Sequence, residues 1–312
     1  RLVPAFERIE NRLASFVSYL PLAAVAFLAA ALVWVAGFAL ARWDRPWQSI
    51  APNAFIAEIY RQIVRLVFII GGLGFLVLSD VLKLRRWRRF TLHTRIMLAG
   101  TAALIALPML AFSVLEWSNP GTFGAHESAA ARLTEAWFHT VTTRTAGFNT
   151  SATSALTDAS TFLTIVLMII GGGTTSTAGG IKVTTFVVLL LATVAFFRRR
   201  TELRAFGFSI ALEQVLKVMA LLTMSLFVIV TAFFVLLATQ EIDFQTLLFE
   251  VASAFGTVGL GQGATGELDH LGRLIICAVM FLGRVGPLTL GFFLAVSVAP
   301  RVRYPASPIH LG

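Results

Sequence analysis

Long apolar runs alternate with short polar segments along the chain, and this pattern predicts its elements. A helix needs about 20 apolar residues to cross a bilayer. Runs that reach or approach this length are residues 13–41, 63–82, 96–115, 159–197, 218–240 and 274–299. Two of these runs are interrupted by small residues, at GGGTTSTAGG in 159–197 and near GRVGP in 274–299. The pattern therefore predicts an all-α polytopic membrane protein.

Two shorter amphiphilic stretches, residues 129–142 and 244–254, cannot span a bilayer. Each runs into a polar, glycine-containing loop, TTRTAGFNT at 142–150 and FGTVGLGQG at 255–263. One interpretation is a surface helix that lies on the membrane. The other is a re-entrant pore helix, which dips into the membrane and returns through irregular backbone.

The two loops belong to an internal repeat. A single ungapped offset of 112 residues aligns Thr145 with Thr257, Gly147 with Gly259, Met168 with Met280, and Gly171 with Gly283. A partial third copy ends at FIIGGLGF, residues 68–75, and would place a loop glycine at position 47, where the sequence has Trp47. The nearest glycine is Gly37, in AGFAL. The repeated unit is therefore a span, a short re-entrant helix, a loop and a second span, clear twice and doubtful once.

Composition and charge support a membrane location. The chain is 57% hydrophobic and 13% charged, with a net charge of +9, whereas soluble domains carry about 25% charged residues. Basic residues cluster in segments 83–89, 198–204 and 301–303, at the ends of apolar runs. This positive-inside pattern places residues 83–95, 198–204 and 301–303 in the cytoplasm and argues against nucleic-acid binding. The acidic segments 116–158 and 241–273 are then outside.

Enzymatic chemistry is not indicated. The lone Cys277 excludes an intrachain disulfide framework and a cysteine-based metal site. The histidines lack metal-ligand spacing, and no nucleophile–base pair or hydrolytic carboxylate dyad is present. The chain is therefore not expected to be an enzyme.

The repeated loops suit a cation filter. Rings of backbone carbonyls replace the hydration shell of an ion in such filters, and glycine can turn its carbonyl toward an axis. The candidate segments are Arg144, Thr145, Ala146, Gly147 and Phe148, and Gly256, Thr257, Val258, Gly259 and Leu260. The alternative is a plain glycine turn between helices. The Arg144 side chain is expected to point away from the filter and brace its loop. Glu250 either contributes a negative electrostatic field near the filter or forms a hydrogen bond with a neighbouring repeat.

The small-residue segment 171–180 is either a helix-packing hinge or unwound backbone lining a water-filled cavity. Arg284 lies in the middle of an apolar run, where a charge is costly and faces a cavity or a partner. A buried structural ion pair is its alternative role. Lys182 could extend toward the cytoplasm.

These motifs resemble the Trk/Ktr/HKT superfamily of potassium transporters, and most closely its bacterial TrkH/KtrB-type pore subunit. The resemblance covers about residues 58–312 and is carried by TTRTAGFNT, GGGTTSTAGGIKVTTF, SAFGTVGL, MFLGRVGPLTL, TLHTRIML and EWSNPGT. It implies M1–pore helix–M2 units around a pseudo-symmetric pore. Residues 1–89 would hold part of the second unit, 90–205 the third and 206–312 the fourth, with the first unit missing at the N-terminus.

The resemblance also implies a function and its residues. Potassium would pass through the filter, bound at Thr145, Gly147, Thr257 and Gly259. The gate would consist of Gly171, Gly172, Gly173, Thr174, Thr175, Ser176, Thr177, Ala178, Gly179, Gly180 and Arg284. A homodimer in the bacterial inner membrane would bind a cytoplasmic RCK-type regulatory subunit, and nucleotide would act only through that subunit. No covalent cofactor is expected.

An ion-coupled secondary transporter, driven by sodium or protons, is the alternative. Its substrate site would lie at a broken helix, which the interrupted runs would provide. The lack of acidic residues within the apolar runs argues against proton coupling.

Overall fold

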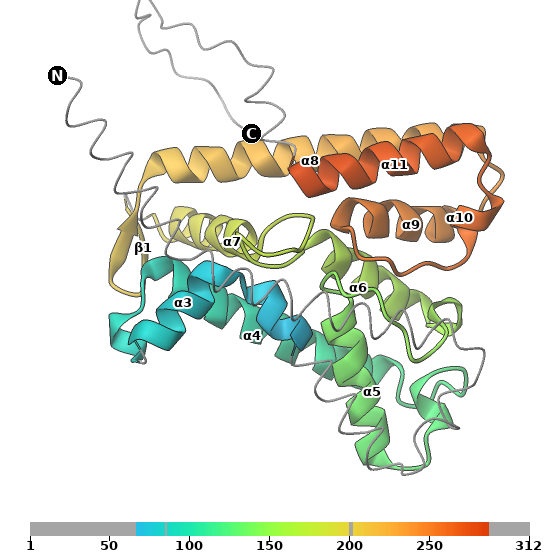
Figure 1. The fold of residues 1–312 in the computed structure, drawn as a ribbon, viewed down its shortest axis with the longest axis horizontal. Helices are drawn as coiled ribbons and strands as arrows, with labels where there is room; N and C mark the ends of the chain where they lie inside the picture. Colours follow the sequence, from blue (N-terminus) through green and yellow to red (C-terminus); the bar gives the residue numbers. More distant parts are fainter. Residues whose placement is uncertain (1–66, 85, 200–201, 287–312) are drawn as a thin grey trace, which may run out of the picture.

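The computed structural model describes residues 67–84, 86–199 and 202–286, and these form an array of helices (Figure 1). Two helices in this part are long and apolar enough to cross a membrane, α4 (Leu92–Leu115) and α8 (Leu212–Thr239). A third candidate is the bent pair Val67–Leu73 and Phe75–Leu84. The predicted run 13–41, Gly37 and Trp47 lie outside the described residues.

The elements follow the predicted order of long and short segments. They are α3 (Phe75–Leu84), η2 (Trp87–Arg89), α4, η3 (Phe123–Ala125), α5 (Ala129–Thr142), η4 (Thr153–Ala155), α6 (Asp158–Ile169), α7 (Val183–Phe197), β1 (Leu203–Ala205), β2 (Phe208–Ile210), α8, α9 (Phe244–Gly256), α10 (Ala264–Glu267) and α11 (His270–Val285). Of the two short stretches, 129–142 is α5 with the same bounds, and 244–254 is α9, which ends two residues later.

Hydroxyl and carboxylate side chains determine where most of these helices begin. Ser128 accepts a hydrogen bond from the Ala131 amide at the start of α5, and Asp243 accepts two from the first turn of α9. Such N-caps satisfy amides that have no partner inside the helix. The long run 159–197 is divided into α6 and α7 by irregular residues that are closed by a bridge between Ile170 and Ile181.

The helices bury one face and leave the other apolar and exposed. The largest core cluster joins α8, α9 and α11 through residues such as Leu236, Val251 and Phe255, all fully buried. On the outer side of α8, Phe227 and Phe234 are 65% and 69% exposed. Because water would disfavour such a surface, it is the face expected to contact lipid acyl chains.

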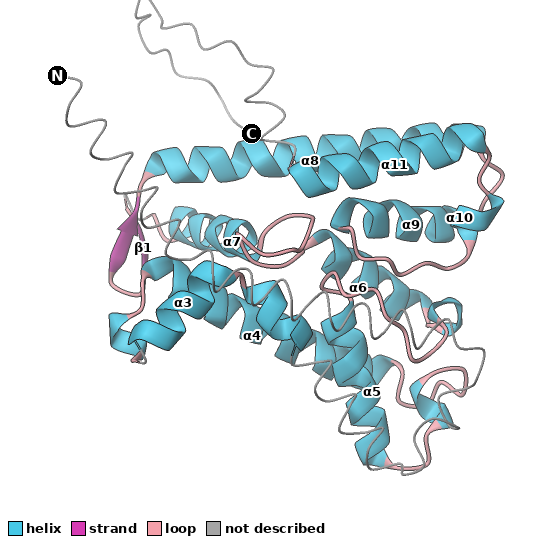
Figure 2. Cartoon of the chain, viewed as in Figure 1, coloured by secondary structure: helices cyan, strands magenta, loops and turns pink. Residues whose placement is uncertain are grey.

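Two features were not predicted from the sequence. The chain bends by 97° between Val67–Leu73 and α3, at Gly74, whose φ of +84° favours glycine. The fold is also not purely α-helical, because β1 and β2 form an antiparallel hairpin (Figure 2). Its two turn residues, Phe206 and Gly207, both have positive φ, the geometry that matches the twist of a tight hairpin.

Candidate functional site

The two predicted filter loops meet in space although 112 residues separate them. A Cβ built on Gly147 would lie 3.2 Å from the Gly259 Cα and would overlap the Val258 carbonyl oxygen. A Cβ built on Gly259 would lie 3.7 Å from the Gly147 Cα. The backbones of the two loops are therefore in direct contact, and a side chain at Gly147 would not fit.

The two loops adopt left-handed backbone at the positions that the repeat aligns. The φ angles are +69° at Thr145 and +75° at Gly147 in the first loop, and +51° at Thr257 and +95° at Gly259 in the second. Positive φ is unfavourable for a β-branched residue and persists only when surrounding structure holds it. Strain of this kind concentrates at functional sites.

Hydroxyl side chains from the short helices hold each loop. The Thr142 Oγ1 accepts a hydrogen bond from the Phe148 amide at 2.9 Å and donates one to the Phe148 carbonyl at 2.5 Å. In the second loop, the Ser253 Oγ accepts one from the Gly259 amide at 3.2 Å. Each hydroxyl is six residues before the amide that it binds, so each short helix fixes the loop that follows it.

Buried carboxylates on the short helices hold the outer parts of the same loops. Glu250 accepts hydrogen bonds from the Gln262 amide at 3.1 Å and the Thr265 hydroxyl at 2.7 Å. Glu250 therefore binds its own loop, and in the part of the chain that the structure describes no hydrogen bond joins it to the neighbouring repeat that the sequence analysis considered. Glu135 accepts hydrogen bonds from Thr150 and Ser151 in the first loop.

A pair of hydrogen bonds joins the outer parts of the two loops to each other. The Thr153 hydroxyl donates to the Gly261 carbonyl at 2.5 Å, and the Gln262 side chain donates to the Thr153 carbonyl at 3.1 Å. The relative position of the loops is thus fixed by direct bonds as well as by backbone contact.

The small-residue segment 171–180 lies against the second loop. A Cβ built on Gly179 would be 2.8 Å from the Gly256 carbonyl oxygen and 2.9 Å from the Thr257 Cγ2. On its other side, the Gly173 amide donates to the Gly72 carbonyl at 2.6 Å. The segment is therefore packed between the candidate filter and the bend at Gly74.

Two cationic side chains bind carbonyls of this segment. Arg284, on α11, donates to the Thr177 carbonyl, and Lys182 donates to the Ala178 carbonyl at 2.5 Å. The Gly180 amide also donates to the Gly283 carbonyl at 3.3 Å. Neither cation forms an ion pair within the part of the chain that the structure describes, so the ion-pair alternative for Arg284 has no support there.

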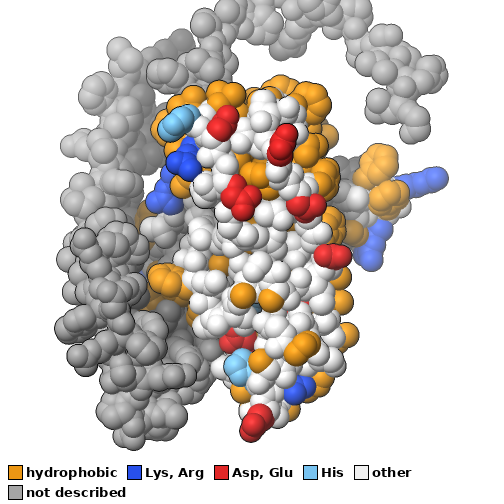
Figure 3. Space-filling view, turned by 90° about the vertical axis from the view of Figure 1, so that its right-hand side faces the viewer, with side chains coloured by type: hydrophobic (Ala, Val, Ile, Leu, Met, Phe, Trp, Pro, Cys, Tyr) orange, Lys and Arg blue, Asp and Glu red, His pale blue; other side chains and the backbone are white. Residues whose placement is uncertain are grey.

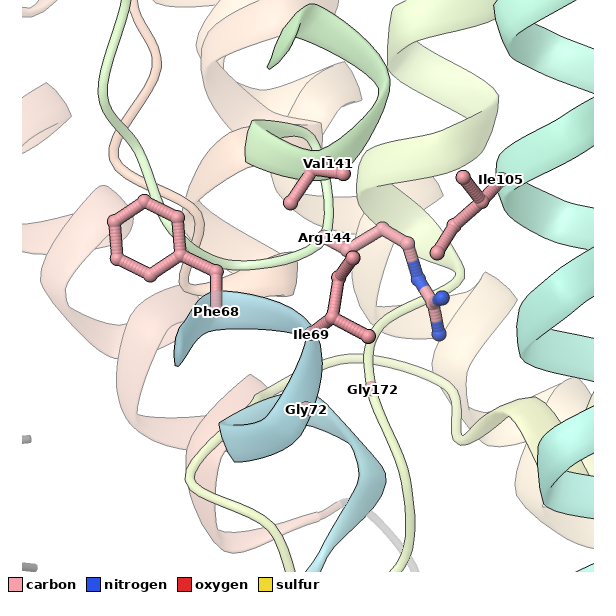
Figure 4. Close-up of a pocket in the computed structure, with 7 residues that line it drawn as sticks. All are labelled: Phe68, Ile69, Gly72, Ile105, Val141, Arg144 and Gly172. Carbon is pink, nitrogen blue, oxygen red and sulfur yellow. The ribbon is translucent and has the colours of Figure 1, made fainter. Parts of the chain in front are cut away.

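Arg144 is buried, with 9% of its surface exposed. It lines a pocket with Phe68, Ile69, Gly72, Ile105, Val141 and Gly172 (Figure 4). Its Nε has no hydrogen-bond partner among the described residues, so Arg144 does not brace the loop by a hydrogen bond from that atom. The ring of Phe148 instead stacks on Phe68, with ring centroids 5.4 Å apart.

Glu116, just after α4, organises the outer segment that leads to α5. It is fully buried, and Thr122 and Thr157 donate to its two carboxylate oxygens at 2.5 and 2.7 Å. Burial alone would raise the pKa of Glu116, but hydrogen bonds from Ser160, Thr122 and Thr157 outweigh it and lower the pKa to about 2. The sequence analysis did not single out this residue, although it lies in the quoted motif EWSNPGT.

Replacing this carboxylate should destabilise the fold. A lowered folded pKa contributes stability above the ordinary value of 4.5, and that stability is lost as the pH falls toward 2. Glu116→Gln should lower the free energy of unfolding by about 2 kcal/mol at pH 7, since charged hydrogen bonds are lost. The melting temperature of the variant should also fall less than that of the wild type as the pH is lowered. Thermal unfolding of the detergent-solubilised protein from pH 7 to pH 3 measures both effects. Glu127→Gln, an exposed carboxylate in the same segment, is the control, and equal profiles for the two variants would contradict the assignment.

Comparison with known proteins places the chain in a family. Residues 20–300 match the TrkH family model, described as a cation transport protein. Ktr system potassium uptake protein B of Bacillus subtilis (strain 168) is 39% identical over 250 residues, covering 80% of this chain and 56% of that protein. The protein of the same name from Vibrio alginolyticus is 40% identical over 250 residues, covering 79% and 54%. Potassium/sodium uptake protein NtpJ of Enterococcus hirae is 38% identical over 262 residues, covering 80% and 57%.

A solved structure supports the same conclusion for the fold. The potassium transporter TrkH from Vibrio parahaemolyticus matches with a TM-score of 0.64 and 20% identity, over 75% of this chain and 52% of that chain. The chain spans about half the length of the curated relatives it matches. These relatives are transporters, and the resemblance inferred from the motifs is confirmed. This membrane protein belongs to the TrkH family of cation transport proteins and is a homologue of the Trk/Ktr pore subunits.

Proposed function

We propose that this chain contributes to a pore for potassium uptake across the bacterial inner membrane. One observation carries the proposal: two loops, aligned by an internal repeat, meet through Gly147 and Gly259 with left-handed backbone at matching positions. Residues with left-handed backbone alternate with other residues along each loop, which allows successive carbonyl groups to point toward the same side. A filter needs this arrangement, because its carbonyl oxygens replace the water molecules around the ion. The names of the relatives point to potassium as that ion.

In this proposal the filter consists of residues 144–148 and 256–260, and potassium binds at the carbonyls of Thr145, Gly147, Thr257 and Gly259. The units at 90–205 and 206–312 are the third and fourth M1–pore helix–M2 repeats, and residues 1–89 hold part of the second. The order of a long helix, a short helix, a loop and a further helix, observed in α4–α7 and again in α8–α11, supports this division.

Segment 171–180 is proposed to act as the gate. It is packed against Thr257 on the second filter loop, and Arg284 binds its Thr177 carbonyl. An arginine at this place raises the barrier for a cation, because like charges repel strongly where water is scarce. Opening would require the segment to separate from Arg284.

We also propose that the protein works as a homodimer with a cytoplasmic RCK-type nucleotide-binding subunit. The names of two relatives describe a Ktr system. The segments around Arg88 and Arg198 are exposed and positively charged, which bears on the orientation of the molecule in the membrane and not on the subunit. Several acidic side chains gather on the face of the molecule opposite the hairpin (Figure 3), and Asp158, Glu241 and Glu267 are exposed. This polarity supports a cytoplasmic location for the basic end.

Isotope flux separates a pore from a coupled carrier. Proteoliposomes that contain the protein as purified from its native membrane, with any subunits it retains, should take up rubidium tracer in exchange for internal potassium without sodium or a proton gradient. A sodium- or proton-coupled carrier would require one of them, and one relative is named a potassium/sodium uptake protein. Uptake that depends strictly on either co-ion would overturn the pore mechanism.

A second measurement tests ion binding without transport. An ion that binds only the folded state raises the melting temperature. Potassium should therefore stabilise the detergent-solubilised protein more than sodium does at equal ionic strength. Equal stabilisation by the two ions would argue against a potassium-selective filter.

A further inference from the structure

One end of the molecule presents aromatic rings surrounded by arginines. We call this the basic-aromatic surface. Its rings are Trp87, Phe206 and Phe208, which are 46%, 46% and 44% exposed. Its basic residues, all exposed, are Arg86, Arg88, Arg89, Arg198, Arg199 and Arg204. The surface therefore combines the two side-chain types that membrane proteins place at the headgroup level.

Arg95 joins the two loops that form this surface. Its guanidinium donates to the Arg88 carbonyl at 2.7 Å and to the Phe206 carbonyl at 3.2 Å, and it lies 5.3 Å from the centre of the Phe208 ring. The rings of Trp87 and Phe206 also meet edge to face, with centroids 6.1 Å apart. Segments 86–90 and 203–210 thus form one continuous surface.

This surface lies at the ends of the membrane helices. In the hairpin, Ala205 and Ile210 are buried in a cluster with Ile96, in the first turns of α4. The 24 residues of α4 extend over about 36 Å, more than the roughly 30 Å of a bilayer core. The first turn of α4, and the hairpin packed on it (Figure 1), are therefore at the interface.

The positive charge of the surface is largely uncompensated. Arg204 pairs with Glu202 at 2.7 Å, but the other five arginines form no ion pair in residues 67–84, 86–199 and 202–286. The nearby Asp80 carboxylate accepts hydrogen bonds from Thr91 and Thr94, both at 2.7 Å. An anionic ligand would supply the missing negative charge.

We propose that the basic-aromatic surface binds the headgroups of anionic phospholipids in the cytoplasmic leaflet. Clustered basic residues beside a membrane helix attract such lipids, and the exposed rings would insert at the headgroup level. The surface is also continuous along the chain with Phe196 and Phe197 at the end of α7, each 79% exposed, which favours lipid over a protein partner. The proposal depends on the proposed orientation in the membrane but not on ion conduction.

Quenching of Trp87 fluorescence by brominated lipid tests this proposal. The protein is reconstituted in vesicles that contain brominated phosphatidylglycerol or brominated phosphatidylcholine, and the signal of Trp87 is taken as wild type minus Trp87→Phe. Phosphatidylglycerol should quench that signal at a lower mole fraction. Each arginine removed should reduce the preference about fivefold, so Arg88→Gln combined with Arg89→Gln should reduce it by roughly 25-fold.

Arg273→Gln is the matched control, since Arg273 is an exposed arginine at the other end of the molecule and binds the Gly266 carbonyl at 3.1 Å. It should leave the preference unchanged. Equal quenching by the two lipids, or an unchanged preference in the Arg88/Arg89 variant, would overturn the proposal. A Trp87 signal that neither lipid quenches would also overturn it and would indicate a protein partner. None of these results requires transport, so failure here is distinct from failure of the pore mechanism.

Discussion

Gly147→Ala is expected to reduce potassium flux strongly in the proteoliposome assay. The residue has a φ of +75°, and left-handed backbone costs alanine about 1–2 kcal/mol. The new methyl would also overlap the Val258 carbonyl oxygen and lie 3.2 Å from the Gly259 Cα. The methyl cannot be accommodated unless the two proposed filter loops separate. We expect at least a tenfold loss of flux, because each 1.4 kcal/mol changes an equilibrium about tenfold.

Two further variants separate the effect of backbone strain from the effect of steric overlap. Gly259→Ala introduces the strain of a φ of +95°, but its methyl would contact only the Gly147 Cα, at 3.7 Å, so a smaller loss is expected. Gly266 lies in α10, and no atom lies within 4 Å of a methyl built there, so Gly266→Ala should leave the flux unchanged. Melting temperature and gel filtration verify folding. A folded Gly147→Ala protein with normal flux and selectivity would exclude Gly147 from the filter.

Arg284→Ala is expected to raise the potassium flux. The substitution removes a positive charge beside segment 171–180, the proposed gate, and the hydrogen bond to the Thr177 carbonyl. A hydrogen bond to a charged group contributes about 1.5–3 kcal/mol, so the opening equilibrium should shift by roughly tenfold or more. Tracer flux at equal protein content measures the change.

The control for this variant lies on the same helix. Arg273 also donates to a backbone carbonyl, that of Gly266, at 3.1 Å, but it does so far from segment 171–180. Arg273→Ala should therefore leave the flux unchanged. If Arg284→Ala folds normally and its flux is unchanged or lower, Arg284 has no gating role.

The sequence predicted the elements of this fold well where hydrophobic pattern and caps agree. The bounds of α5 are those predicted, because the capping residue Ser128 precedes an amphiphilic stretch of defined length. The hairpin at 203–210 was missed, because Phe206 is an unusual residue for a turn with positive φ. Local preference gave the wrong expectation there because the turn is held by tertiary contacts, including the bond from Arg95.

The repeat made the equivalence of the two candidate loops predictable, but it did not reveal their contacts. The repeat identified Gly147 and Gly259 as equivalent, and they lie together. The bond from Arg284 to Thr177 joins residues 107 apart in the chain, and no local pattern encodes such a partner. The hydroxyls of Thr142 and Ser253 were also missed, although each occurs in the last turns of a short helix and six residues before the amide that it binds.

The bend at Gly74 has a mechanical consequence. A Cβ at this position would overlap the Thr174 carbonyl oxygen, and the neighbouring Gly72 carbonyl binds the Gly173 amide at 2.6 Å. Both contacts lie next to the N-terminal end of the ten-residue helix α3, which ends two residues before Arg86. A displacement of α3 would therefore be transmitted directly to segment 171–180, the proposed gate.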